Sequence, residues 1–164
     1  MKPTVALVGA TKSGRSSVGQ ELAFLLDVPL TENENLLEDD LHDLVVSDPK
    51  GATWKIVESA RKLCEYDGVV TLLPSAATDA HTLETFAARG VPIVLLTCSP
   101  SKLASRANLS APRPTTLGTP RAMFNSMISQ FLETVTPHVT ASFSTEDTKA
   151  SEVAIAIRDT IART

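Results

Sequence analysis

The chain has few of the residues that mark specialised classes of protein. Its 164 residues include two cysteines, one tryptophan and one tyrosine, and its 15 Lys and Arg are outnumbered by 19 Asp and Glu. Two cysteines without metal-ligand spacing argue against a zinc site. We expect Cys64 and Cys98 to be reduced core thiols, with a disulfide or redox pair as the alternative. The net charge of −4 argues against a nucleic-acid partner, because binding a phosphate backbone needs clustered cations.

Long apolar runs are also missing. No stretch approaches the ~20 apolar residues that a membrane-spanning helix needs, so no membrane partner is expected. Met1-Lys2-Pro3 leads directly into a strand-like segment, which leaves no room for a signal peptide. We therefore expect a cytoplasmic protein. A length of 164 residues predicts a single domain spanning 1–164.

Strand-like and helix-like segments alternate along the chain. Strands are expected at 4–8, 28–30, 68–73, 92–97 and 139–143, and helices at 16–26, 54–65, 78–89, 99–106, 121–133 and 149–163. Apolar strands separated by helices indicate a parallel sheet covered on both faces. The fold class predicted is therefore α/β, a three-layer α/β/α domain with a five-stranded parallel sheet. The polar, proline-rich segment 107–119 is expected to be a mobile loop.

One segment joins the first expected strand to the first expected helix and carries a chemical signal. Gly9-Ala10-Thr11-Lys12-Ser13-Gly14-Arg15-Ser16 has the spacing of the phosphate-binding P-loop G-x-x-x-x-G-K-[ST], with arginine in the lysine position. Its two glycines let several N–H groups converge on an anion, and the following helix adds the positive end of its dipole. The alternative is a coincidental glycine turn. The predicted nucleotide-binding residues are Gly9, Lys12, Ser13, Gly14, Arg15, Ser16 and Ser17.

With this loop in place, the whole chain resembles the shikimate kinases, small P-loop phosphotransferases of the nucleoside-monophosphate-kinase fold. The likeness rests on residues 7–26, on the strand that starts at Gly68, on 99–106 and on Arg113-Pro114. It implies ATP and Mg²⁺ as cofactors and a small hydroxyl-bearing molecule as the phosphoryl acceptor.

The resemblance also implies roles for individual residues. Arg106 would lie beside the adenine, and Arg113, on a lid-like loop near 107–119, would approach the transferring phosphoryl group; an ordinary surface arginine is the alternative for both. Ser16 and Glu32 would serve the metal, and Glu34 would orient the acceptor hydroxyl. Arg15 and Arg113 would neutralise charge during transfer.

The acceptor side departs from the pattern of that family. Leu73-Pro74-Ser75 stands where the family has three glycines, no arginine lies near 51–54 to clamp a carboxylate, and His138 lies near the place of a second arginine. Trp54 is expected to pack in its helix. Three functions stay open: a kinase with weakened or altered shikimate binding, a kinase for an acceptor without a carboxylate, and a catalytically degenerate nucleotide- or anion-binding regulatory protein with a protein partner.

Overall fold

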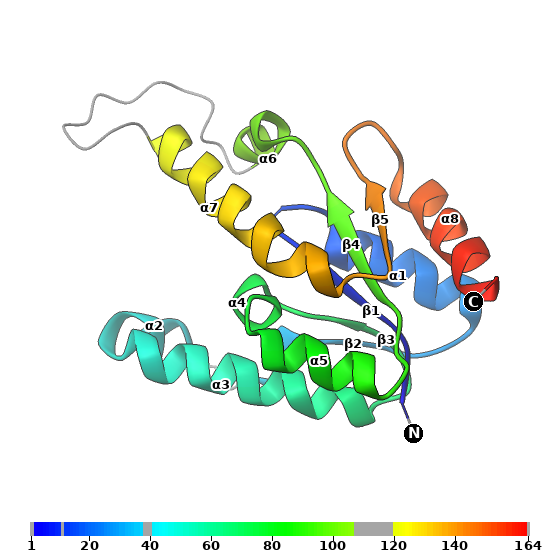
Figure 1. Cartoon of the computed structure of the whole chain (residues 1–164), viewed down its shortest axis with the longest axis horizontal. Coiled ribbons are helices and arrows are strands. Elements are labelled where there is room, and N and C mark those ends of the chain that lie inside the picture. The colour runs from blue at the N-terminus through cyan, green and yellow to red at the C-terminus, as the bar shows by residue number, and fades with distance from the viewer. Residues whose placement is uncertain (1, 11, 38–40, 107–119, 164) are drawn as a thin grey trace.

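The strands of the chain form a five-stranded parallel sheet with helices on both faces (Figure 1). The computed structural model describes residues 2–10, 12–37, 41–106 and 120–163. The strands are β1 (Pro3–Gly9), β2 (Leu30–Glu32), β3 (Gly68–Thr71), β4 (Ile93–Thr97) and β5 (Ala141–Ser144), in the spatial order β2-β3-β1-β4-β5. The helices are α1 (Arg15–Leu26), α2 (Leu41–Ser47), α3 (Pro49–Lys62), α4 (Pro74–Ala77), α5 (Ala80–Ala88), α6 (Pro100–Arg106), α7 (Pro120–Val135) and α8 (Ala150–Ala162), with 3₁₀ turns η1 (Asn33–Leu36), η2 (Leu63–Glu65) and η3 (Thr136–His138). The predicted fold class is confirmed.

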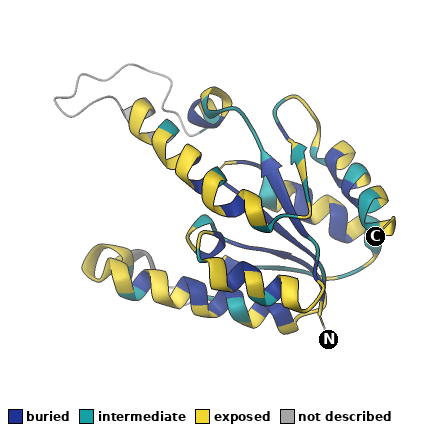
Figure 2. Cartoon of the chain, in the orientation of Figure 1, coloured by how far each residue is buried: buried dark blue, intermediate teal, exposed yellow. Residues whose placement is uncertain are grey.

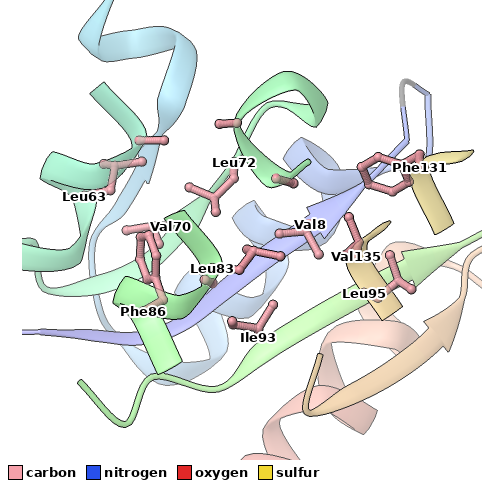
Figure 3. Packing of buried hydrophobic residues seen from close by; sticks show 14 of the residues in the cluster. Val8, Leu63, Val70, Leu72, Leu83, Phe86, Ile93, Leu95, Phe131 and Val135 are labelled. Atoms are coloured by element: carbon pink, nitrogen blue, oxygen red, sulfur yellow. The ribbon is translucent and has the colours of Figure 1, made fainter. Parts of the chain in front are cut away.

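The central strand β1 is buried on both faces, as a strand of a covered parallel sheet must be. Val5 and Leu7 pack into one apolar cluster with α1 and α8, whereas Ala6 and Val8 pack into another with α3, α5 and α7. Figure 2 shows the buried strands between helices that are exposed on their outer sides. Figure 3 shows the second cluster, in which Phe86 and other side chains from the helices meet those of the strands.

Two features near α3 differ from the sequence-based expectation. Helix α3 begins at Pro49 rather than at Trp54, because the Asp48 carboxylate caps it by accepting a hydrogen bond from the Gly51 amide at 3.1 Å. The predicted packing of Trp54 is wrong, since its side chain is 60% exposed. The structure also adds α2 in the segment before this cap.

The connections between strands create a crevice at the carboxyl end of the sheet. From β1 the chain passes through α1 on one face to β2, and from β3 it passes through α4 and α5 on the other face to β4. Because β1 and β3 are hydrogen-bonded neighbours, their carboxyl ends lie at a topological switch point, where α/β proteins bind ligands. Residues 12–15 line a cavity at this edge, and Arg15 donates to the carbonyl of Leu72, just beyond β3.

The state of the two cysteines and the length of the helices can be compared with the expectations of core thiols and of no membrane-spanning helix. Cys64 is buried and Cys98 is partly buried, and both are free. Within the described ranges, every helix is too short or too polar to cross a bilayer.

Candidate functional site

The loop between β1 and α1 has the backbone shape of an anion cradle. Lys12 has a φ of 69° and Gly14 a φ of 98°, and the Ser13 amide donates to the Ala10 carbonyl at 3.0 Å. Positive φ values in such a turn bring successive N–H groups to one side, which forms a concave nest for an anion. The predicted strand–turn–helix is therefore present, with the N-terminus of α1 facing the loop.

The floor of the loop explains why a glycine is needed at its start. A Cβ at Gly9 would lie 2.2 Å from the Ser13 Oγ and 3.1 Å from the Leu96 carbonyl oxygen. Ser13 is 1% exposed, and its hydroxyl has no hydrogen-bond partner among the residues that the structure describes. The loop thus folds back over the end of β1, and only a bare α-carbon fits beneath it.

Two side chains from distant parts of the sequence hold the outer side of the loop. Arg106, at the end of α6, donates from Nη1 to the Lys12 carbonyl at 3.0 Å and from Nη2 to the Thr145 carbonyl at 2.8 Å. The Thr145 hydroxyl donates to the Ser13 carbonyl at 2.6 Å. Arg106 therefore braces the loop with its guanidinium, and its predicted place beside an adenine stays a prediction. Thr145 was missed; its position just after the last strand, at the carboxyl edge, is the signal that could have found it.

A cavity of about 590 Å³ opens over the loop. Its described lining residues are Lys12, Ser13, Gly14, Arg15, Ser16, Ser17, Val18, Arg106, Thr145, Thr148 and Ala150. The charged members of this set are three cations, in a chain whose net charge is −4. Such a cavity suits a polyanion, and five predicted nucleotide-binding side chains, together with Gly14 and Arg106, line it.

Arg15 lies at the edge of this cavity and points toward the crevice. Its Nη1 donates to the Leu72 carbonyl at 2.5 Å, just beyond the end of β3. Burial lowers the pKa of Arg15, while the nearby carboxylates of Glu34 and Glu32 oppose that shift. The guanidinium is charged, because arginine side chains are not deprotonated in proteins. The residue in the P-loop lysine position is thus engaged on the β2–β3 side of the site.

Ser16 and Glu32, the two predicted metal partners, lie together. The Ser16 hydroxyl, in the first turn of α1, donates to the Glu32 carboxylate at the end of β2. A hydroxyl and a carboxylate are hard oxygen ligands of the kind that Mg²⁺ accepts, with phosphate oxygens and water completing its shell. The donor set fits Mg²⁺, although the described residues contain no group of three or more His, Cys, Asp or Glu that could hold a metal alone.

Asn33 fixes the segment that carries the two acidic residues. It is fully buried; its Oδ1 accepts from the Leu73 amide at 3.1 Å, and its Nδ2 donates to the Ser59 hydroxyl at 2.6 Å. One side chain therefore ties β2 and η1 to the end of β3 and to α3. Glu34, next in the chain, is exposed and close enough to Arg15 to affect its pKa.

The other residues predicted to lie on the acceptor side occur in several different parts of the fold. Pro74 begins α4, so the segment 73–75 leads straight into a helix. A second cavity of about 470 Å³ lies between α3 and α4, lined in part by Trp54, Arg61 and Asp79. His138 is partly exposed on η3. Arg113 and the lid-like segment 107–119 lie outside the described residues.

Comparison with known proteins supports the fold and the resemblance. No family model matches the chain. It is 28% identical over 159 residues to a shikimate kinase of Thermobifida fusca (strain YX), covering 93% of this chain and 91% of that protein. A structure of shikimate kinase from Acinetobacter baumannii in complex with shikimate superposes with a TM-score of 0.79 at 17% identity, over 99% of this chain and 94% of the other. A gluconokinase structure from Sinorhizobium meliloti 1021 gives a TM-score of 0.67 at 19% identity, over 99% and 93%. The chain has the P-loop kinase fold, and its resemblance to the shikimate kinases is confirmed.

Proposed function

We propose that this chain is an ATP-dependent phosphotransferase of the shikimate kinase type, which moves the γ-phosphoryl group to a small hydroxyl-bearing acceptor. The observation that supports the proposal is that the residues of the cationic cavity and the Ser16–Glu32 pair lie next to one another at the carboxyl end of the sheet. The cationic cavity over the loop borders the Ser16–Glu32 pair, and Arg15 links that pair to the end of β3. A polyphosphate site next to a metal-binding pair is the arrangement that phosphoryl transfer requires.

On the nucleotide side, the loop supplies main-chain N–H groups and charge. Gly9 and Gly14 permit the cradle, and Ser13 and Ser17 border it. The cation Lys12 lines the cavity, and Arg106 holds the Lys12 carbonyl in place. Ser16 and Glu32 would hold Mg²⁺, which when bound neutralises charge on the outer phosphate oxygens. Arg113, in the expected lid, would add positive charge at the transferring group.

On the acceptor side, Glu34 would accept a hydrogen bond from the acceptor hydroxyl and orient it. The segment 73–75 offers fewer amides than the three glycines of the related kinases, because Pro74 has none and the Leu73 amide is already bonded to Asn33. With no arginine in 51–54, we expect weakened affinity for a carboxylate such as shikimate.

A second candidate is a degenerate relative that binds a nucleotide or an anion and acts on a protein partner. The observation in its favour is the position of Arg15, whose guanidinium is bonded to the Leu72 carbonyl. An arginine held there cannot at once serve the outer phosphates as the lysine of a working loop does.

A thermal-shift experiment followed by an ADP-release assay tests the proposal. ATP–Mg²⁺ at ~100 times its Kd should stabilise the protein by about 2.7 kcal/mol, and ADP should appear with at least one member of a panel of small polyols and hydroxy acids that includes shikimate. Ser16→Ala is the matched control, because it removes one metal partner and should abolish the Mg²⁺ dependence. Stabilisation by ATP without ADP release from any acceptor would favour the degenerate relative. No stabilisation by any nucleotide would refute both.

A further inference from the structure

We infer that Lys12, three residues before the usual lysine position, supplies the cation for the outer phosphates, and that Arg15 serves the acceptor side of the crevice. This assignment rests on the proposed function and divides one role between two residues. Three observations support it: the direction of the Arg15 side chain, the backbone conformation of Lys12, and the bonds that Arg106 already makes to two carbonyls.

The first step concerns Arg15. Its Nη1 is bonded to the Leu72 carbonyl, beyond the end of β3, and the residue is partly buried. Glu34 and Glu32 are the carboxylates that affect it electrostatically. A guanidinium bonded to a carbonyl and attracted by two carboxylates is stabilised where it lies. Moving it to the phosphates would break that hydrogen bond and uncover the carbonyl.

The second step concerns the backbone of Lys12. Its φ of 69° lies in the left-handed region, where the Cβ of a residue other than glycine is crowded by its own backbone. The bond from Arg106 to the Lys12 carbonyl, and the bond from Thr145 to the next carbonyl, hold the strained turn from outside. A glycine would adopt this turn without strain. A lysine at position 12 is therefore less stable in this backbone conformation than a glycine would be.

The third step concerns unused donors. Among the three cations that line the cavity, Arg106 is engaged with the Lys12 and Thr145 carbonyls, and Arg15 with the Leu72 carbonyl. The Lys12 side chain is exposed and has no hydrogen-bond or ion-pair partner among the described residues. An ammonium group is a compact charge with three rotatable donors, which suits contact with phosphate oxygens. Lys12 is therefore the cation with all of its donors available to a polyphosphate.

Calorimetric binding to the whole 164-residue chain tests this assignment, with ATP–Mg²⁺, inorganic tripolyphosphate and AMP as ligands. Lys12→Gln should weaken the Kd for ATP and tripolyphosphate by about tenfold and that for AMP by less than about twofold. Lys12→Arg keeps the charge on the same backbone and should stay within about threefold of the wild type. Lys62→Gln, an exposed lysine of α3, is the charge control and should change each Kd by less than about twofold. Arg15→Gln should change the Kd for ATP less than Lys12→Gln does.

A measurement without ligand checks the backbone part of the argument. Lys12→Gly should raise the melting temperature by about 2 °C, because glycine adopts a positive φ without strain. If the wild type binds tripolyphosphate and ATP but Lys12→Gln matches Lys62→Gln, or Arg15→Gln loses more affinity, this inference is overturned and the proposed function stands. If the wild type binds neither ligand, the proposed function fails, and this inference fails with it.

Discussion

Replacing Gly9 by alanine should destabilise the protein by a specific clash beneath the loop. The new Cβ would lie 2.2 Å from the Ser13 Oγ, where contacts under 3.0 Å essentially never occur, so the hydroxyl must move by about 0.8 Å. Ser13 is 1% exposed, and hydrogen bonds fix its carbonyl and its amide, so it has little room to move. Overpacking of this kind costs about 1–3 kcal/mol, and we expect a loss near 2 kcal/mol in the free energy of unfolding.

A double-mutant cycle in urea isolates the clash. Ser13→Ala removes a buried hydroxyl that has no partner among the described residues, so on its own it should stabilise the protein by about 1 kcal/mol. In that background Gly9→Ala should cost less than about 1 kcal/mol, because the remaining contacts, with the Ser13 Cβ and the Leu96 carbonyl, are both at 3.1 Å. The coupling free energy should therefore be about 1–2 kcal/mol.

Gly51→Ala is the matched control for this cycle. A Cβ there would lie 2.3 Å from the Asp48 Oδ2, a nearly identical overlap, but Asp48 is exposed and its carboxylate can rotate into solvent. Rotation loses the bond from the Gly51 amide that caps α3, but alanine favours the helix by about as much, so we expect a net change within about 1 kcal/mol. An equal cost of Gly9→Ala with serine or with alanine at position 13 would refute the reasoning, because the hydroxyl would then not be the obstacle.

Three other substitutions test the surroundings of the site. Asn33→Ala leaves a main-chain amide at the end of β3 without its acceptor and should cost about 2–3 kcal/mol in urea unfolding, whereas the exposed neighbour Asn35→Ala should cost less than about 0.5 kcal/mol. Thr145→Val removes the hydroxyl that holds a loop carbonyl, so the Kd for ATP should weaken about fivefold with AMP less affected; equal losses for both ligands would contradict the brace. Partial burial alone would raise the pKa of Asp79, but its bonds from an arginine and a threonine and the arginine charge hold that pKa below its usual value. The stabilisation is present above the unfolded-state pKa of about 3.9 and is lost as pH falls through the lower folded-state pKa. Asp79→Asn should therefore cost about 0.5–1 kcal/mol near pH 7 in thermal scans, and this cost should shrink as the pH falls below about 3.9.

The layer architecture could be predicted from the sequence because local signals and burial agree along most of it. The apolar runs at 68–73 and 92–97 became β3 and β4, and the glycine turn after 4–8 became the loop before α1. The start of α3 was predicted five residues late, although Asp48-Pro49 is itself a capping signal, since the apolar pattern of that helix is clear only from Trp54 onward. The spatial order of the strands depends on which faces the connections cover, and no local pattern encodes that.

The site was predictable in its backbone and less so in its side chains. The spacing from Gly9 to Ser16 located the cradle, because the turn depends on residues adjacent in sequence. The direction of Arg15 depends on a carbonyl 57 residues away and on the carboxylates of Glu32 in β2 and Glu34 in η1. The brace from Arg106 spans 94 residues. Such contacts follow from the packed structure, and the motif alone gives no sign of them.

The shape of the loop is therefore a property of the whole carboxyl edge of the sheet. Arg106 closes the end of α6, and Thr145 follows β5, and both hold carbonyls of a turn that Lys12 disfavours. Any movement of α6 or of the segment after β5 must release those carbonyls, and the strain at Lys12 would then favour a different turn with fewer N–H groups directed at one anion. Conversely, an anion bound by those N–H groups stabilises the turn and so the contacts that hold it. We therefore expect occupancy of the cradle to depend on the position of α6, through these two hydrogen bonds and the φ angle of Lys12.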